Sequence, residues 1–150
     1  MNPLNLSLRV GVLVASLAFA GCSPMRSMST SADSASFRTT LSAAAEVPPN
    51  ASNATGTLDA TFDKSTSTLR WTLNYAGLSG PVTAAHFHGP AMAGANAGVA
   101  VPIPNAVSPN AGSATLTPAQ VADLMAGKWY VNVHTAAHPG GEIRGQLTAQ

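Results

Sequence analysis

The chain has one cysteine, Cys22, and charged residues make up only 9% of its 150 residues. A single cysteine excludes a disulfide framework and a cysteine-ligated zinc cluster, so packing must hold the fold. Seven basic and six acidic residues leave no basic stripe, and we therefore expect no nucleic-acid partner. The Gly-x-Ser-x-Gly elbow of serine hydrolases and the glycine-rich phosphate loops are also absent.

The N-terminal segment predicts export. Residues 1–21 carry one positive charge, Arg9, before an apolar run at 10–20 that is too short to span a bilayer. Small residues directly before Cys22 resemble the lipobox of bacterial lipoproteins, in which this cysteine is acylated, and Ser23 resembles an outer-membrane sorting signal. We therefore expect a lipid anchor at Cys22 that tethers the protein to a membrane of the cell envelope. The alternative is an ordinary secretory signal that leaves Cys22 as a spare thiol.

The composition changes twice along the mature chain. Residues 22–36 are small and polar, as expected of a flexible tether. Residues 37–150 have the length of one domain with one modest hydrophobic core.

Hydrophobic and polar side chains alternate along this domain. The alternation predicts half-buried antiparallel strands, and residues 63–67 have the length and composition of a hairpin turn. The candidate strands are residues 38–43, 57–62, 68–75, 82–88, 98–103, 112–116, 129–134 and 142–148. About eight short strands separated by Gly- and Pro-rich turns predict an all-β fold, a Greek-key sandwich or barrel.

One short helix interrupts the strands. It is predicted to begin after Thr117 as N-cap, to continue through Leu124, and to end at Gly127. We expect it to cover one end of the sandwich. The predicted core includes Phe62, Trp71, Leu73 and Trp129.

All four histidines fall in two short clusters, His86 with His88 and His134 with His138. In a strand, side chains two residues apart share one face with their Cβ atoms roughly 6 to 7 Å apart, so the first pair can approach one ion. Alternation places Tyr130, Asn132 and His134 on one polar face of their strand. A Pro-Gly-Gly turn then lets His138 fold back toward His134.

These four histidines therefore predict a metal site. An all-nitrogen ligand set without thiolate is compatible with copper(II) or with zinc. Ligating histidines usually donate their second ring N–H to a carboxylate or carbonyl, a role that suits Glu142 or Asn132. The alternative is that each histidine only caps a strand end or forms a hydrogen bond in a turn.

Three segments, residues 84–90, 130–135 and 139–147, resemble motifs of the CHRD domain family, first named from chordin. The most specific match is the run Gly-Glu-Ile-Arg-Gly-Gln-Leu at 141–147, and residues 41–42 and 46–49 resemble the opening of the domain. The resemblance covers the folded part from Phe37 to Leu147. It implies an immunoglobulin-like β-barrel with limited similarity to Cu,Zn superoxide dismutases, and no general activity is assigned to the family.

Similarity to these dismutases implies that His86 and His88 face copper, with His134 and His138 completing the set. Nothing resembles the zinc subsite, so a dismutase activity would be copper-only, with Arg144 as a candidate anion guide. From alternation alone, Arg144 instead forms an ion pair with Glu142 on the outward face of the last strand. We expect a copper-binding envelope lipoprotein for storage, delivery or superoxide chemistry. The alternative function is a non-catalytic module that binds an unknown protein partner.

Overall fold

The computed structural model describes residues 33–150, so the predicted signal peptide, Cys22 and most of the predicted tether lie outside the described residues. Within residues 33–150 the elements, in chain order, are β1 (Ser34–Ser42), the 3-10 turn η1 (Ala43–Ala45), β2 (Thr55–Asp63), β3 (Thr68–Ala76), β4 (Val82–His88), β5 (Val99–Pro102), β6 (Asn110–Thr115), α1 (Pro118–Met125), β7 (Tyr130–Thr135), β8 (Ile143–Gln146) and β9 (Thr148–Ala149).

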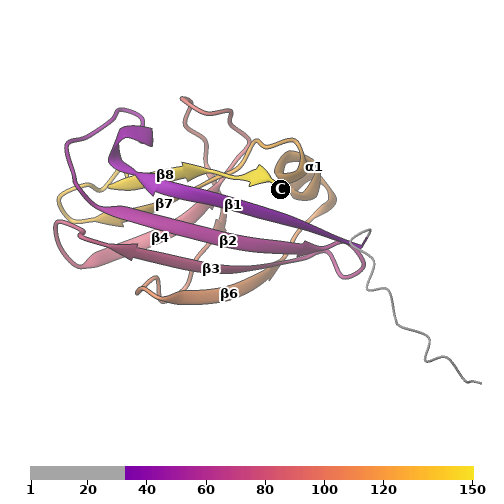
Figure 1. The fold of residues 1–150 in the computed structure, drawn as a ribbon. Helices are drawn as coiled ribbons and strands as arrows, with labels where there is room; N and C mark the ends of the chain where they lie inside the picture. The colour runs from indigo at the N-terminus through magenta and orange to yellow at the C-terminus, as the bar shows by residue number, and fades with distance from the viewer. Residues whose placement is uncertain (1–32) are drawn as a thin grey trace, which may run out of the picture.

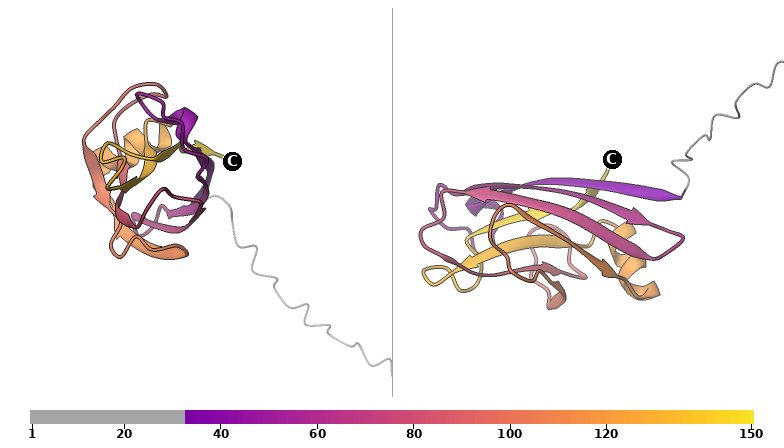
Figure 2. Two further views of the ribbon diagram at one scale, coloured as in Figure 1. Left: turned by 90° about the vertical axis from the view of Figure 1, so that its left-hand side faces the viewer. Right: turned by 90° about the horizontal axis from the view of Figure 1, so that it is seen from below.

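The strands form one hydrogen-bonded sheet that folds into two layers (Figure 1). Its order is β5-β4-β7-β8-β1-β2-β3-β6, and β9 also pairs with β1. The layers join where Ser42 of β1 pairs with Arg144 of β8. Seen end-on in Figure 2, the two layers curve around a shared interior.

The chain passes repeatedly from one layer to the other. It crosses after β3, returns after β5, and crosses again through α1 into β7. Such non-sequential neighbours are the mark of Greek-key connections. The predicted all-β, Greek-key sandwich with one short helix is confirmed.

The β2–β3 hairpin shows why alternation predicted these strands well. Every inward residue is apolar, and the facing pairs include Leu58 with Leu73 and Phe62 with Leu69. Asp63 closes the predicted turn, because its Oδ1 accepts backbone N–H bonds from the two residues Ser65 and Thr66.

The helix also forms where the sequence places it. The Thr117 side chain accepts the Gln120 N–H, and the Gln120 side chain accepts the Thr117 N–H, which completes a capping box. Leu124 is fully buried, and Gly127 ends the helix with a φ of +69°.

The interior between the layers is filled by aromatic and aliphatic side chains. Trp71 meets Phe87 edge-on with ring centroids 5.1 Å apart, and the ring centroids of Trp129 and Phe87 are 6.0 Å apart. A Cβ at Gly112 would lie 2.5 Å from the Trp71 ring, so only glycine allows this packing. The four predicted core residues are all buried: Phe62, Trp71, Leu73 and Trp129.

Most strand boundaries lie within two residues of the prediction, and two strands differ by more. Strand β1 begins at Ser34, so residues 34–36, assigned to the tether, pair with β2 instead. The single strand expected at 142–148 is divided at Leu147, which is fully buried and donates its N–H to Trp129 O at 2.8 Å. This inward bend sends β8 to β7 and β9 to β1.

No helix within residues 33–150 is long and apolar enough to cross a membrane.

Candidate metal centre

The outer face of strands β7 and β8 is covered by other parts of the chain, and that of β4 is covered in part. All six residues of β7 are buried, including Tyr130, Asn132 and His134, which alternation assigned to a polar face. The backbone carbonyls of Ala95, Ala97 and Pro139 accept hydrogen bonds from side chains on this face. Polar groups here therefore depend on partners within the protein.

Two adjacent strands bring three histidines together on this face. Strand β4 turns Phe87 into the core and thereby turns His86 and His88 outward. On β7, His134 pairs with Ala84, two residues before His86. His86 and His134 are thus diagonal neighbours on antiparallel strands, a position from which large side chains touch.

The three imidazoles converge, as the clustering predicted. His86 Nδ1 lies 3.2 Å from His134 Nε2, and the His86 and His88 rings meet edge-on with centroids 5.5 Å apart. One ring nitrogen from each histidine lies within 4.8 Å of the other two. Two nitrogens that each lie ~2.0–2.1 Å from one ion are at most about 4 Å apart, so only small rotations of the side chains are needed to bind a single ion.

Two backbone carbonyls determine which ring nitrogens are free. His88 Nδ1 lies 3.0 Å from Ala97 O, and His134 Nδ1 lies 3.0 Å from Pro139 O. A carbonyl oxygen only accepts, so both Nδ1 atoms carry the proton and both Nε2 atoms carry a lone pair. The Nε2 atom of His88 is buried without a hydrogen-bond partner within residues 33–150.

The third donor is Nδ1 of His86. Since His134 Nε2 has no proton to give, His86 Nδ1 donates across their 3.2 Å contact when no ion is bound. On binding of an ion to Nδ1, this proton would move to Nε2, the other ring nitrogen. His86 as a residue is half-buried. The donor set is therefore one Nδ1 and two Nε2 atoms.

The electrostatics of the site favour neutral rings at His86 and His134. Burial lowers the pKa of His86, and the neighbouring His134 and His88 lower it further. Burial also lowers the pKa of His134, partly offset by the hydrogen bond to Pro139 and reinforced by His88. Neutral imidazole is the form that binds metal.

His138 does not join this group, although the sequence placed it in the ligand set. It lies in the turn after β7, where its backbone N–H donates to Thr135 O at 3.1 Å and its carbonyl accepts from Gly141 N at 3.1 Å. This turn instead holds Pro139, whose carbonyl orients His134. The Pro-Gly-Gly composition predicts the turn correctly. The turn, however, places a backbone carbonyl beside the cluster and leaves the His138 side chain outside it.

The carboxylate expected to support the ligands serves another purpose. Glu142 is fully buried and accepts hydrogen bonds from the side chains of Ser52, Ser79 and Thr135 and from the Ser79 N–H, at 2.6 to 2.8 Å. These four bonds outweigh burial, which opposes ionisation, and lower its pKa to about 2. Neither Glu142 nor Asn132 receives a ring N–H, so that expectation is wrong.

The predicted surface roles of Arg144 are also wrong. Its side chain is buried, stacks on the Tyr130 ring at 3.4 Å, and donates to Ala95 O at 2.7 Å and to Asn96 Oδ1 at 3.0 Å. It therefore neither pairs with Glu142 on an open sheet nor guides anions at the surface. Alternation showed only that Arg144 faces away from the core, and the covering loop buries it.

Sequence reasoning missed the residues that orient the histidines. The carbonyls of Ala97 and Pro139 carry no side-chain signal. The ring of Tyr130 stacks on that of His88, with centroids 4.8 Å apart and planes within 3°. This neighbour was detectable in principle, because Tyr130 shares the outer face with His134.

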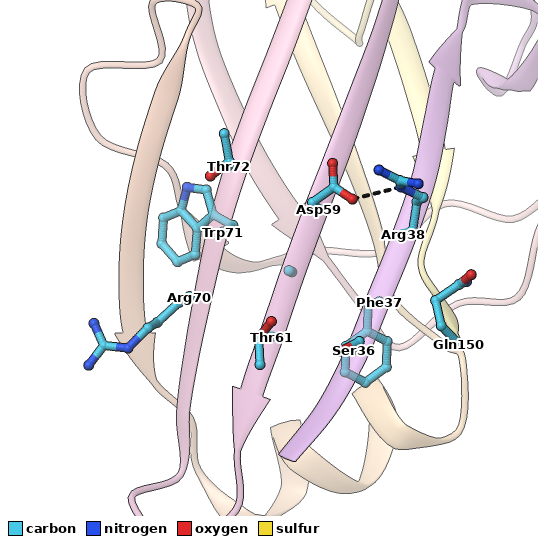
Figure 3. A pocket seen from close by; sticks show the side chains of 10 residues that line it. Ser36, Phe37, Arg38, Asp59, Thr61, Arg70, Trp71, Thr72 and Gln150 are labelled. Carbon is cyan, nitrogen blue, oxygen red and sulfur yellow. Dashed lines mark hydrogen bonds and ion pairs between the residues drawn. The ribbon is translucent and has the colours of Figure 1, made fainter. Parts of the chain in front are cut away.

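A separate hollow of about 450 Å³ lies on the outer face of β1, β2 and β3 (Figure 3). Arg38 of β1 and Asp59 of β2 line it and form an ion pair of 2.6 Å, and Arg70 of β3 points away from them. None of the four histidines lines this hollow.

The family model of the CHRD domain matches residues 37–147, which include the whole histidine cluster and both carbonyls that orient it. The chain belongs to the CHRD domain family. No curated protein and no solved structure gives a significant match to it. CHRD membership thus accounts for the domain, while its chemistry has to be argued from the cluster itself.

Proposed function

We propose that this CHRD domain binds one copper ion through His86 Nδ1, His88 Nε2 and His134 Nε2. The observation that carries the proposal is the free Nε2 of His88, which is buried without a partner beside two other imidazoles. Leaving such a buried acceptor unsatisfied costs about 1–3 kcal/mol. A bound ion removes that cost.

A purely structural role for the histidines accounts less well for their geometry. Structural histidines satisfy their ring nitrogens with protein groups, as His88 and His134 do at Nδ1. Here the remaining nitrogens point instead toward one another. Ring nitrogens gathered in this way, two of them with a lone pair in the metal-free protein, suit a cation better than they suit a protein-binding surface.

Copper is favoured over zinc by affinity. For a site of given nitrogen donors, copper(II) binds more tightly than zinc in the usual order of divalent metals. Three imidazoles also leave at least one position open for water or an exogenous ligand. Zinc is therefore the competitor to test.

The biological role that follows is copper storage or delivery at the cell envelope, with the chain tethered by a lipid at Cys22. Superoxide chemistry receives less support, since the arginine expected to guide anions, Arg144, is buried. An open position on copper nevertheless keeps that activity measurable in the loaded protein.

The proposal is tested by metal analysis of the purified protein, with Cys22 replaced by serine in every sample so that its thiol takes up no copper. We expect one copper per chain. His88→Ala should lose stoichiometric binding, and His86→Ala should weaken it. Competition with equimolar zinc should leave copper in the site.

His138→Ala is the matched control, because it removes a nearby imidazole that lies outside the cluster. It should bind copper like the parent protein. Equal copper uptake by the parent and by a variant lacking all three clustered histidines would refute the proposal.

A further inference from the structure

Three planar side chains lie in a row on the covered face beside the cluster. His88 and Tyr130 are direct cross-strand partners with nearly parallel rings. On the next strand, the Arg144 guanidinium lies 3.4 Å from the centre of the Tyr130 ring. The row links a buried positive charge to one of the candidate ligands.

Arg144 also holds the loop that covers this face. Its two terminal nitrogens donate to Ala95 O at 2.7 Å and to Asn96 Oδ1 at 3.0 Å. Asn96 in turn donates to Val47 O at 2.9 Å, so the loop is held from two sides. A planar guanidinium can make both bonds and the ring contact at once, which lysine cannot.

The next residue of the same loop orients His88. Ala97 O lies 3.0 Å from His88 Nδ1, and the Ala97 N–H donates to the Tyr130 hydroxyl at 3.2 Å. Arg144 therefore acts on His88 by two routes, through the Tyr130 ring and through the loop backbone.

We propose that Arg144 is a positioning residue for the metal centre: it fixes the ring orientation and the Nδ1–H tautomer of His88, so that Nε2 remains free for the ion. The effect on copper rests on the proposed function above. The effect on the tautomer does not, because the Ala97 contact exists without metal.

A structural need alone explains Arg144 poorly. Its side chain is 1% exposed, and within residues 33–150 no carboxylate lies at ion-pair distance from it, although the charge of Glu46 acts on it from farther away. Burying a charge without an ion-pair partner is costly, and an apolar side chain would fill the space at lower cost. The directional contacts to residues 95 and 96 are what an apolar side chain would lose.

The test measures the His88 tautomer and copper affinity in the purified full-length protein with Cys22 replaced by serine. In the metal-free parent, ¹⁵N NMR of the imidazoles should show His88 protonated at Nδ1. Arg144→Met should mix the two tautomers and weaken copper binding by about 10- to 100-fold, while retaining the one-to-one stoichiometry. Arg38→Met removes an exposed arginine from the other layer and should change neither quantity.

Arg144→Lys keeps the charge and serves as the second variant if Arg144→Met does not fold. It should shift the tautomer in the same direction by less. A folded variant at position 144 with the parent's tautomer and copper affinity would overturn the proposal. If the parent binds no copper while the tautomer shifts as expected, the proposed function fails and the positioning role stands.

Discussion

The two layers of this sheet differ in how many of their faces are buried. In β2 and β3, buried and exposed residues alternate, and the outward side chains meet water. In β7 every residue is buried, and in β8 only Gln146 is partly exposed. The first layer thus has a single dry face, whereas in the second layer β7 and β8 are dry on both faces.

This difference in burial determines where a polar side chain is held in one orientation. Arg38 and Asp59 on the open layer have side chains 68% and 50% exposed, so water competes with their ion pair. Arg144 on the covered layer is held by two hydrogen bonds and a ring. Preorganised chemistry needs the second kind of environment, and the histidine cluster lies there.

The largest effect should come from removing the most heavily bonded group of the covered layer. Glu142→Ala leaves four donors from Ser52, Ser79 and Thr135 without their acceptor. We expect the free energy of unfolding to fall by about 3–5 kcal/mol in urea titrations at neutral pH, because bonds to a buried charge are strong.

The matched variant on the other layer is Asp63→Ala. Asp63 also accepts several hydrogen bonds, from Ser65 and Thr66, but in an exposed turn where water replaces them. Asp63→Ala should therefore lower the free energy of unfolding clearly less than Glu142→Ala does. Equal losses from the two variants would show that the covering of one face has no energetic consequence.

A second contrast lies between two buried carboxylates at the covered layer. Glu142 has four donors, whereas Glu46 Oε1 has no hydrogen-bond partner within residues 33–150. Burial raises the pKa of Glu46 to about 7, although Arg144, the Val47 N–H and the Asn132 side chain oppose the shift. Folding should therefore retain a proton on Glu46 that the unfolded chain releases.

This proton predicts a pH dependence with a definite sign. Below pH 4.5, Glu46 is protonated in both states and its contribution is complete. As the pH rises from 4.5 to about 7, only the unfolded state loses the proton, so stability falls by about 3 kcal/mol and then levels off. Glu142 has the opposite sign, since its contribution is lost as the pH falls from 4.5 toward 2.

Urea unfolding of the parent and of Glu46→Gln across this window provides the measurement. The amide keeps the shape of Glu46 but cannot ionise. Subtracting the two curves cancels the titration of His86 and His134, whose pKa values are lowered. A difference between the two proteins that does not change from pH 4.5 to 7 would contradict the prediction.

The contrast between layers also explains what sequence could predict. Period two located β2 and β3 and the side of each strand that faces the core, because inward Leu58 and Leu73 differ so plainly from their outward neighbours. The spacing of His86 and His88 likewise placed both on one face. These inferences depend only on local geometry.

What covers the outward face is not a local property. Nothing in the strand of Arg144 reveals that residues 95–97, far away in sequence, lie over it. For the same reason Arg144 was assigned to the surface, and Ala97 O and Pro139 O went unrecognised as the groups that orient His88 and His134. The histidine cluster could be predicted from the sequence, whereas the contacts that orient its rings could be identified only from the fold.

The smallest effect belongs to the open layer. Arg38→Met removes the ion pair with Asp59, which lies on the sheet surface at 2.6 Å. Despite this short distance, the remaining Asp59 carboxylate is well solvated after the change, so the urea midpoint should match that of the parent within error. In a double-mutant cycle with Asp59→Asn, the interaction energy between the two side chains should be small. It should increase at low salt only as much as reduced screening predicts. Strong, salt-insensitive coupling would mean that the hollow in Figure 3 is itself shielded from water, and the distinction between the two layers would then be wrong.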